Sequence, residues 1–228
     1  MLTQLTYCLR EWDSAFFNRR IGDINLTTHN HFKDTLFDLI TTKVCSDDVN
    51  LISSLNQNGF QYCEGEITFS KMLSNQSHID FDIADESDLP QLSSLVDGMY
   101  KYSRFKSPWF TPEEKDFFYR TWLKKAVLGQ FDDVCIIFRQ KKTIRGFVTL
   151  KLSSNSATIG LIGVNNLCRG QGIGCKLIQC CESYLVNKNI QLIHVATQTS
   201  NVAAINLYIK NDFLVENTSV WLYKSNSS

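Results

Sequence analysis

The C-terminal part of the chain alternates between the two-residue spacing of apolar side chains typical of strands and the wider spacing typical of helices. The segments predicted to be strands are 79–83, 134–138, 146–152, 157–164 and 191–197. The segments predicted to be helices are 85–100, 113–127, 175–187 and 202–210. A final hairpin is predicted from 213–215 and 219–223. This order predicts an α/β protein, more closely an α+β mixed sheet with helices packed against it.

The N-terminal residues 1–76 have a less regular pattern and are predicted to form a small α/β domain of their own. The elements expected in it are strands at 21–26 and 60–69 and helices at 32–40 and 49–55. The small polar residues 74–77 are predicted to be a linker. The larger second domain would then comprise residues 77–228.

Residues 102–112 carry aromatic and basic side chains that fit neither period. Pro108 and Pro112 prevent a continuous helix through this segment. One interpretation is a loop whose aromatic rings fill the core. The other is a lid that stacks on a flat ring and pairs with phosphate charge. The pattern alone leaves both open.

Composition excludes some classes of function. Lys and Arg together number 23, as do Asp and Glu, so bulk attraction to nucleic acid is not expected. No apolar run reaches the length of a membrane span, and the N-terminus lacks the pattern of a signal peptide, so a cytoplasmic location is expected. The eight cysteines show no paired ligand spacing and are expected to be free, buried thiols. No metal site is predicted.

A glycine-rich loop carries the strongest chemical signal. Three glycines stand within residues 170–174, between the predicted strand 157–164 and the helix 175–187. Glycines allow a tight turn, and the N–H groups at the start of a helix attract a phosphate or pyrophosphate. The glycine spacing differs from that of a dinucleotide-binding fold, and the Gly-Lys-Ser/Thr of a P-loop is missing. The loop is therefore predicted to bind another phosphate-bearing ligand.

The same loop resembles the acetyl-CoA motif of the GNAT N-acetyltransferases. That family's pattern is Gln or Arg, any two residues, Gly, any residue, and Gly or Ala. Arg169, Gly172 and Gly174 match this pattern. Val164 stands where the family has the valine that leads into the loop.

A second signature of that family lies on the next helix, where an Asn, an Ala and a Tyr share one face. Asn201, Ala204 and Tyr208 match it, while Asp212 replaces the usual Gly before Phe213. The resemblance covers roughly residues 79–224. It implies a GNAT fold with the small N-terminal α/β part as an appendage.

The resemblance also implies acetyl-CoA as the co-substrate. The loop residues that would bind its pyrophosphate are Arg169, Gly170, Gln171, Gly172, Ile173 and Gly174. The main chain of Leu161, Gly163 and Val164 would pair with the pantetheine arm along a splayed strand edge, and the strand near Leu161 would supply an N–H for the oxyanion. Asn201 would bond the arm, and Tyr208 would protonate the leaving thiolate.

The general base and the acceptor are less well defined. Strand 157–164 carries no Asp or Glu, so a chain of waters or an already neutral amine is the hypothesis. A narrower resemblance links the chain to GNAT enzymes that acetylate the 4-amino group of a dTDP-linked 4-amino-4,6-dideoxyhexose. The segments that carry it are 12–17, 103–110, 195–201 and 221–223.

On this interpretation the acceptor is a nucleotide sugar. Arg104 and Lys106 would bind its diphosphate, and Phe105, Trp109 or Phe110 would stack on its base. Gln198 would contact the sugar. Two alternatives stay open: a GNAT enzyme that acetylates another small amine or a protein amine, and a non-catalytic acyl-CoA-binding module. The resemblance also suggests a homodimer, with the apolar C-terminal hairpin as its interface.

Overall fold

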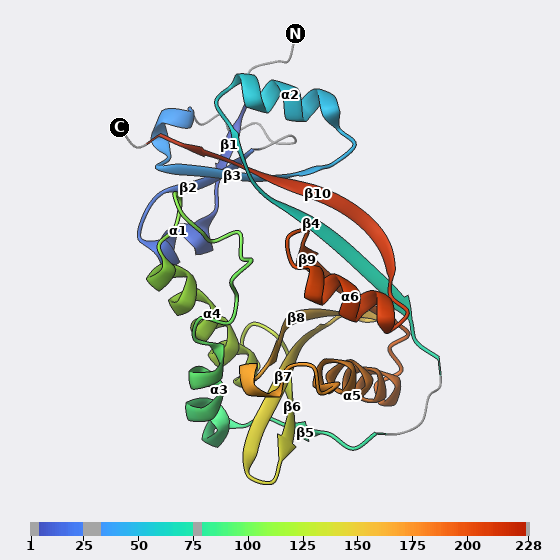
Figure 1. Ribbon diagram of the computed structural model, residues 1–228. Coiled ribbons are helices and arrows are strands. Elements are labelled where there is room, and N and C mark those ends of the chain that lie inside the picture. The colour runs from blue at the N-terminus through green and yellow to red at the C-terminus, as the bar shows by residue number, and fades with distance from the viewer. Residues whose placement is uncertain (1–4, 25–32, 75–78, 227–228) are drawn as a thin grey trace.

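The computed structural model describes residues 5–24, 33–74 and 79–226. Ten strands form one continuous sheet with helices on both faces, which confirms the predicted fold class (Figure 1). From edge to edge the strands are β1 (Tyr7–Leu9), β2 (Ile21–Ile24), β3 (Leu39–Cys45), β10 (Leu214–Ser225), β4 (Gln61–Met72), β9 (Leu192–Gln198), β8 (Ser156–Val164), β7 (Thr143–Leu152), β6 (Val134–Gln140) and β5 (Asp82–Ile83). The helices are α1 (Glu11–Phe17), α2 (Val49–Gln57), α3 (Leu89–Val96), α4 (Pro112–Val127), α5 (Ile173–Asn187) and α6 (Val202–Lys210).

The central strands are buried on both faces. In β6, Cys135 and Ile137 pack into the core beneath α3 and α4, whereas Val134 and Ile136 pack into the core beneath α5. Figure 1 shows these helices on opposite sides of β6, β7 and β8. A strand covered on both faces carries apolar side chains at consecutive positions, which explains the continuous apolar run in the sequence.

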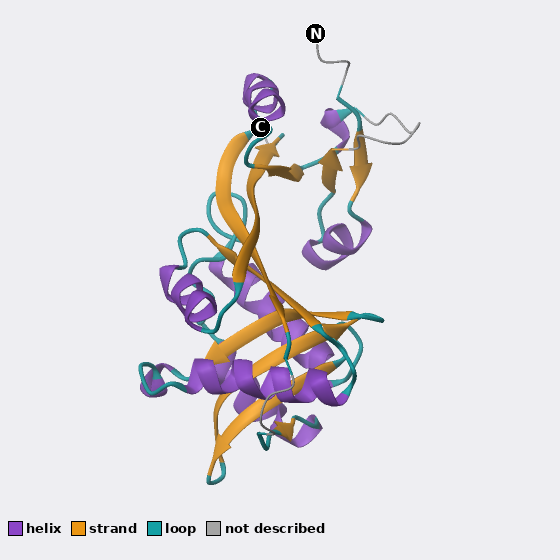
Figure 2. Ribbon diagram, turned by 90° about the vertical axis from the view of Figure 1, so that its right-hand side faces the viewer, coloured by secondary structure: helices purple, strands orange, loops and turns teal. Residues whose placement is uncertain are grey.

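Two long strands join the N-terminal and C-terminal parts of the sheet (Figure 2). β10 pairs antiparallel with β3 on one side and with β4 on the other, and β4 also pairs with β9. One sheet thus contains strands from both sides of the domain boundary that the sequence suggested between residues 76 and 77. The linker residues 75–77 lie outside the described residues, and the division into two domains stays a prediction.

The helix predicted at 32–40 is wrong. Residue 32 lies outside the described residues, Asp34–Leu36 form one 3₁₀ turn, and the chain then enters β3. Ile40 and Val44 pack into a core with Leu222, because β10 offers β3 a full strand partner. Leu36, which the helical pattern would bury, is 45% exposed. Tertiary pairing has overridden local spacing here.

The predicted C-terminal hairpin is also wrong, because residues 214–225 form one strand. Its pairing with β4 shifts register between Val215 and Asn217, so Glu216 is the extra residue of a bulge. The polar residues that suggested a turn therefore lie within β10. On α6, the apolar side chains of Val202 and Ile209 are 61% and 55% exposed, so they do not pack against the sheet.

The other general expectations concern cysteines, membranes and metals. All eight cysteines are free, and burial raises the pKa of Cys63 to about 11 and that of Cys135 to about 12. Cys45 is exposed, against the expectation of burial. Within the described ranges, no helix combines the length and apolar character needed to cross a membrane. Nor do the described Cys, His, Asp and Glu side chains gather in a cluster suited to a metal ion.

Candidate active site

Strands β8 and β9 separate part-way along their length. They pair in parallel only from Ser156 with Leu192 to Ile159 with Val195. Beyond Ile159, β8 remains paired with β7 alone among the described strands, with a register shift opposite Thr149. One edge of residues 160–164 is therefore open, and its N–H and C=O groups can pair with an extended ligand.

Two hydrogen bonds establish which residues face this open edge. The Asn165 N–H donates to the Arg145 carbonyl at 2.8 Å, and the Leu161 N–H donates to Thr149 Oγ1 at 2.8 Å. Both donors point toward β7. Successive residues of a strand direct their N–H groups to opposite sides, so Gly163 also faces β7, while Ile162 and Val164 face the open edge.

This geometry corrects part of the predicted ligand contact. Val164 keeps its expected place, but Leu161 and Gly163 direct their main-chain groups to the neighbouring strand. Ile162, which the sequence analysis did not select, faces the open edge instead. Because N–H groups alternate along a strand, knowing which way one N–H points would have separated the residues that face β7 from those that face the open edge. The sequence does not reveal the direction of any of these N–H groups.

The glycine loop offers a group of free donors at the start of α5. Gly170 and Gly172 have φ angles of +76° and +78°, in the left-handed region that glycine adopts at little cost. In the part of the chain that the structure describes, the N–H groups from Gly170 to Cys175 have no hydrogen-bond acceptor. The Arg169 side chain is exposed and is likewise without a described polar partner. These features fit a phosphate or pyrophosphate group.

The other loop residues serve mainly the protein itself. Gln171 Nε2 donates to the Leu167 carbonyl at 3.4 Å, and Ile173 is buried in the core. A Cβ atom on Gly174 would lie 3.1 Å from Leu207, so this glycine allows α5 and α6 to pack closely. Gln171, Ile173 and Gly174 therefore hold the loop in place, and any ligand contact from these residues would come from the backbone.

Helix α6 borders the open edge and carries two predicted residues. Asn201 caps the helix, since its Oδ1 accepts from the Ala204 N–H and its Nδ2 donates to Thr197 Oγ1. The Tyr208 ring is 2% exposed and packs against Phe69 and Phe213. Burial, with a smaller contribution from Cys181, raises the pKa of Tyr208 well above its ordinary value. Tyr208 therefore stays protonated and can donate a proton.

Polar side chains form a wall across four strands next to the end of β9. The register aligns Lys43 on β3, Trp221 on β10 and Glu64 on β4 in one row. A second row contains Ser219, Glu66 and Gln198. Directly opposed residues in a sheet share a face, so Gln198 lies beside two buried carboxylates that the sequence analysis did not select. We refer to the six side chains of these two rows as the polar wall.

Both carboxylates of the polar wall are hydrogen-bonded. Glu66 accepts from Trp221 Nε1 at 2.9 Å and from Lys43 Nζ at 3.0 Å. Glu64 accepts from Lys106 Nζ at 2.6 Å, and its other oxygen lies 3.4 Å from Thr199 Oγ1. The pairing explains how two carboxylates only two residues apart are kept inside the fold.

The segment 102–112 places its basic residues against this wall. The Arg104 guanidinium lies 4.0 Å from the ring centre of Trp221 and 4.2 Å from that of Phe105, and its Nη1 donates to the Tyr223 hydroxyl at 2.5 Å. The described carboxylates form no ion pair with Arg104. Burial acts to lower the pKa of Arg104, but the Tyr223 hydroxyl and the charge of Asp13 raise it overall, so the guanidinium stays positively charged and can attract an anionic ligand. Trp109, half-buried, stands edge-on to Tyr223 with ring centres 5.1 Å apart.

The predicted stacking role does not fit Phe105. Its side chain is 4% exposed and its ring centre lies 4.3 Å from that of Phe118, with Arg104 over the ring. Phe110 is equally buried, at 3% exposed. Of the three aromatic candidates, Trp109 alone keeps an accessible surface. The segment thus combines both interpretations, because its phenylalanines fill the core while its basic residues face the polar wall.

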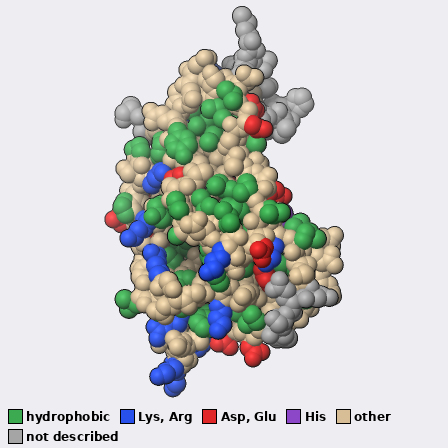
Figure 3. Space-filling view, turned by 45° about the vertical axis from the view of Figure 1, so that its right-hand side comes forward, with side chains coloured by type: hydrophobic (Ala, Val, Ile, Leu, Met, Phe, Trp, Pro, Cys, Tyr) green, Lys and Arg blue, Asp and Glu red, His purple; other side chains and the backbone are tan. Residues whose placement is uncertain are grey.

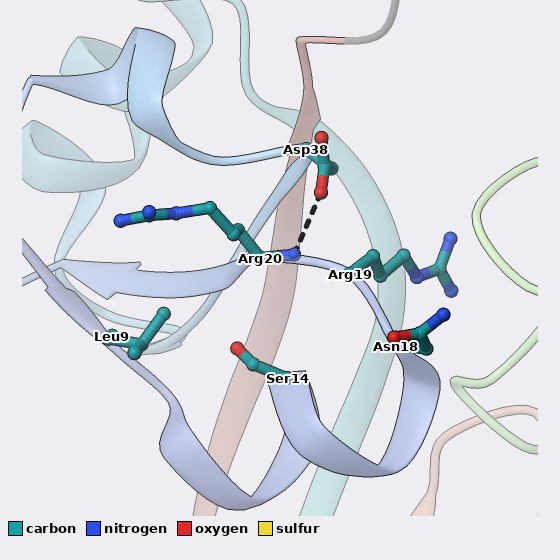
Figure 4. A pocket seen from close by; sticks show the side chains of 6 residues that line it. All are labelled: Leu9, Ser14, Asn18, Arg19, Arg20 and Asp38. Atoms are coloured by element: carbon teal, nitrogen blue, oxygen red, sulfur yellow. Dashed lines mark hydrogen bonds between the residues drawn. The ribbon is translucent and has the colours of Figure 1, made fainter.

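The molecular surface has hollows in at least two places. One opens in the lower half of the face drawn in Figure 3, with Lys and Arg side chains around it. The other, of about 450 Å³, lies at the turn from α1 into β2 and is lined by Leu9, Ser14, Asn18, Arg19, Arg20 and Asp38 (Figure 4). None of these lining residues belongs to β8, the glycine loop or α6, so this second hollow is separate from the candidate active site.

Comparison with known proteins agrees with this geometry. Residues 97–213 match the acetyltransferase (GNAT) family. The chain is 32% identical over 219 residues to the dTDP-fucosamine acetyltransferase of Escherichia coli O6:H1 (strain CFT073), an alignment that covers 93% of this chain and 95% of that protein.

Solved structures share the fold at low sequence identity. A functionally unknown conserved protein of Staphylococcus epidermidis has a TM-score of 0.62 at 13% identity, covering 91% of this chain and 85% of its own. The PaiA N-acetyltransferase of Thermoplasma acidophilum, in complex with coenzyme A, has a TM-score of 0.53 at 18% identity, covering 64% of this chain and 99% of its own. At such identities only the fold is shared.

The conformation of the glycine loop generates a prediction for Gly172→Ala. A Cβ atom would meet no neighbour within 4 Å there, but alanine at φ +78° is strained by about 1 kcal/mol. We expect the strain to displace the free N–H groups and to weaken acetyl-CoA binding about fivefold, measured by calorimetry. Gly59→Ala, at φ +84° far along the chain, is the matched control and should leave the affinity unchanged. Equal affinities in both variants would contradict the role of the loop.

Proposed function

Because the chain belongs to the acetyltransferase (GNAT) family and is an acyltransferase, we propose that it transfers the acetyl group of acetyl-CoA to a nucleotide sugar. The acceptor is the 4-amino group of a dTDP-4-amino-4,6-dideoxyhexose, with the D-galactose form as the first choice. The product would be a precursor of a cell-surface polysaccharide. The arrangement of Arg104 and two buried carboxylates beside the end of β9 carries this proposal.

Acetyl-CoA fits the donor groups on its side of the site. The free N–H groups at the start of α5 suit a pyrophosphate, and the open edge of β8 suits an arm that carries amide groups. Ile162 and Val164 would hold that arm in an extended conformation. The bound co-substrate supplies a thioester as the acyl donor. A ligand held in this way would direct its thioester along the edge of β8, toward α6 and Tyr208.

The polar wall suits the acceptor. Arg104 has no described carboxylate partner and would bind the diphosphate, with Lys106 beside it. Trp109 has accessible ring surface for the base, and Gln198 would contact the sugar. An acceptor amine is protonated in water at neutral pH, so a carboxylate nearby both attracts it and can accept its proton.

Glu66 is the better placed of the two carboxylates to act as general base. It lies directly opposite Gln198 on β9, the strand that borders the open edge. Its ion-pair partner Lys43 is 47% exposed and weakly held, whereas Glu64 is paired with Lys106 at 2.6 Å. Glu66 would take the proton of the amine, directly or through water, and Tyr208 would give its proton to the sulfur as the carbon–sulfur bond breaks.

The proposal is tested by incubating the protein with acetyl-CoA and a panel of amines while free thiol is followed. The panel contains the dTDP-linked 4-amino sugars of galacto and gluco configuration, a simple polyamine and a peptide with a free N-terminus. Turnover confined to the nucleotide sugars supports the proposal. Turnover on the polyamine or peptide favours another GNAT acceptor, and binding of acetyl-CoA without thiol release indicates a non-catalytic module.

Replacing Tyr208 by Phe should lower kcat by ~10²-fold with little change in acetyl-CoA affinity, because the ring stays packed while the proton donor is lost. The raised pKa also means that ionisation of Tyr208 should cause no loss of wild-type kcat below about pH 10, the ordinary value for tyrosine. Steady-state kinetics and calorimetry measure these quantities. A fully active Phe variant would remove Tyr208 from the mechanism.

Glu66→Gln keeps the shape of the side chain but removes its ability to accept a proton, so it should lower kcat by about 10²-fold with the nucleotide sugar still bound. Glu64→Gln is the matched control on the same strand and should lower kcat far less. Equal kcat values in the two variants would mean that the base is another group or water.

Arg104→Met keeps much of the side-chain volume between Trp221 and Phe105 but removes the charge. We expect KM for the nucleotide sugar to rise at least about tenfold, because a charge-assisted contact to phosphate is lost, while acetyl-CoA affinity is retained. The control is Arg120→Met, which removes a surface arginine paired with Asp97. An unchanged KM in Arg104→Met would place the diphosphate elsewhere.

A further inference from the structure

Attack on a thioester creates a negatively charged oxygen that needs a hydrogen-bond donor. The N–H expected to serve it, near Leu161, is already engaged by Thr149 Oγ1 at 2.8 Å. Thr149 Oγ1 in turn donates to the buried carboxylate of Asp132 at 2.5 Å. This chain of bonds holds the Leu161 N–H toward β7, and the proposed function uses the N–H groups of Ile162 and Val164 for the pantetheine arm, so a side chain is the candidate for a further donor.

Tyr100, in the segment between α3 and α4, reaches the open edge of β8 from the side of α3. Its hydroxyl donates to the Ile162 carbonyl at 3.4 Å, the one hydrogen bond of this hydroxyl among the described residues. Ile162 is one of the two residues that face the open edge. A bond of this length is weak, so the hydroxyl can turn to a stronger acceptor that arrives at the same edge.

The ring of Tyr100 is held while its hydroxyl stays free to turn. It stacks on Tyr119 with ring centres 4.0 Å apart and planes 20° apart. The Tyr119 hydroxyl is itself fixed by Ser103 Oγ at 2.8 Å, and Ser103 Oγ accepts from the Phe105 N–H at 3.0 Å. The stack therefore positions the Tyr100 hydroxyl without occupying its hydrogen-bonding capacity.

The hydroxyl of Tyr100 lies at the open edge, and the phenol of Tyr208 on α6 is near enough to add to the rise that burial causes in the pKa of Tyr100. Burial raises the pKa of Tyr100 well above its ordinary value, and the neighbouring hydroxyls of Tyr119 and Tyr208 raise it further. Both phenols are therefore protonated in the working pH range. Tyr100 and Tyr208 can therefore serve as two separate donors, one of a hydrogen bond and the other of a proton.

We propose that Tyr100 is a catalytic residue whose hydroxyl donates a hydrogen bond to the thioester carbonyl oxygen and stabilises the oxyanion formed from it. This assignment rests on the proposed acetyl transfer. The amine nitrogen bonds to the carbonyl carbon and gives up one proton to the proposed base, and the electron pair of the C=O bond moves to oxygen, which accepts from Tyr100. When the carbonyl re-forms, the carbon–sulfur bond breaks and the sulfur takes the proton of Tyr208. Tyr100 keeps its own proton throughout.

Tyr100→Phe tests this assignment, because it keeps the ring stacked on Tyr119 and removes only the donor. We expect kcat to fall by about 10²-fold, the effect of losing one oxyanion donor, while the Kd for acetyl-CoA changes less than about twofold. The matched control is Tyr102→Phe, which removes an exposed hydroxyl two positions along the same segment and should leave kcat unchanged.

Infrared difference spectra of acetyl-CoA labelled with carbon-13 at the carbonyl provide a readout that does not depend on turnover. Bound to the wild type without acceptor, the carbonyl band should move to lower wavenumber than in solution. Tyr100→Phe should lose part of this shift, and Tyr208→Phe should keep it. An unshifted band in the wild type, or full kcat in Tyr100→Phe, would overturn the role of Tyr100.

The outcomes separate this inference from the proposed function. A wild-type protein that binds and turns over acetyl-CoA, with Tyr100→Phe equal to it in kcat and carbonyl band, refutes Tyr100 alone. A wild-type protein that does not bind acetyl-CoA refutes both. If the Tyr100→Phe protein fails to fold, an unshifted wild-type band still overturns the role of Tyr100.

Discussion

The separation of β8 from β9 beyond Ile159 is the feature on which the rest of the site depends. A parallel strand pair that ends in the middle of a sheet leaves backbone groups without partners, and such groups are costly when they are buried. The register shift opposite Thr149 and the bonds from Leu161 to Thr149 and from Thr149 to Asp132 keep β8 on β7 instead of letting it close onto β9. The structure thus reserves one edge of a strand for an extended ligand.

The two substrates would meet where this edge borders the long strands β4 and β10. The glycine loop, the open edge and α6 belong to the C-terminal half of the chain, whereas Glu64 and Glu66 lie on β4 from its N-terminal part. The continuous sheet brings them together through the pairing of β4 with β9. The N-terminal residues therefore contribute to the proposed acceptor site directly, by supplying the carboxylates that β8 lacks.

Local sequence signals predicted what depends on neighbours along the chain. The glycine loop, the order of most elements and the shared face of Asn201 and Tyr208 all follow from spacing within one segment. The proposed general base does not, because Glu66 lies opposite Gln198 only through the register between β4 and β9. Local spacing also selected Leu161 instead of Ile162 as a residue that faces the open edge. The direction of a strand's N–H groups is set by its pairing with a neighbouring strand, which local spacing does not show. Likewise, the predicted helix 32–40 extended into the first residues of β3, because the strand's partner, β10, lies at the far end of the sequence.

Hydrogen exchange of single backbone amides, with and without acetyl-CoA, tests the open edge most directly. The account predicts that the amides of Ile162 and Val164 become protected when acetyl-CoA binds, because they then donate to the ligand. The amides of Leu161 and Gly163 face β7 and should change little. Equal protection of all four, or none at Ile162 and Val164, would contradict the claim that acetyl-CoA pairs with this strand.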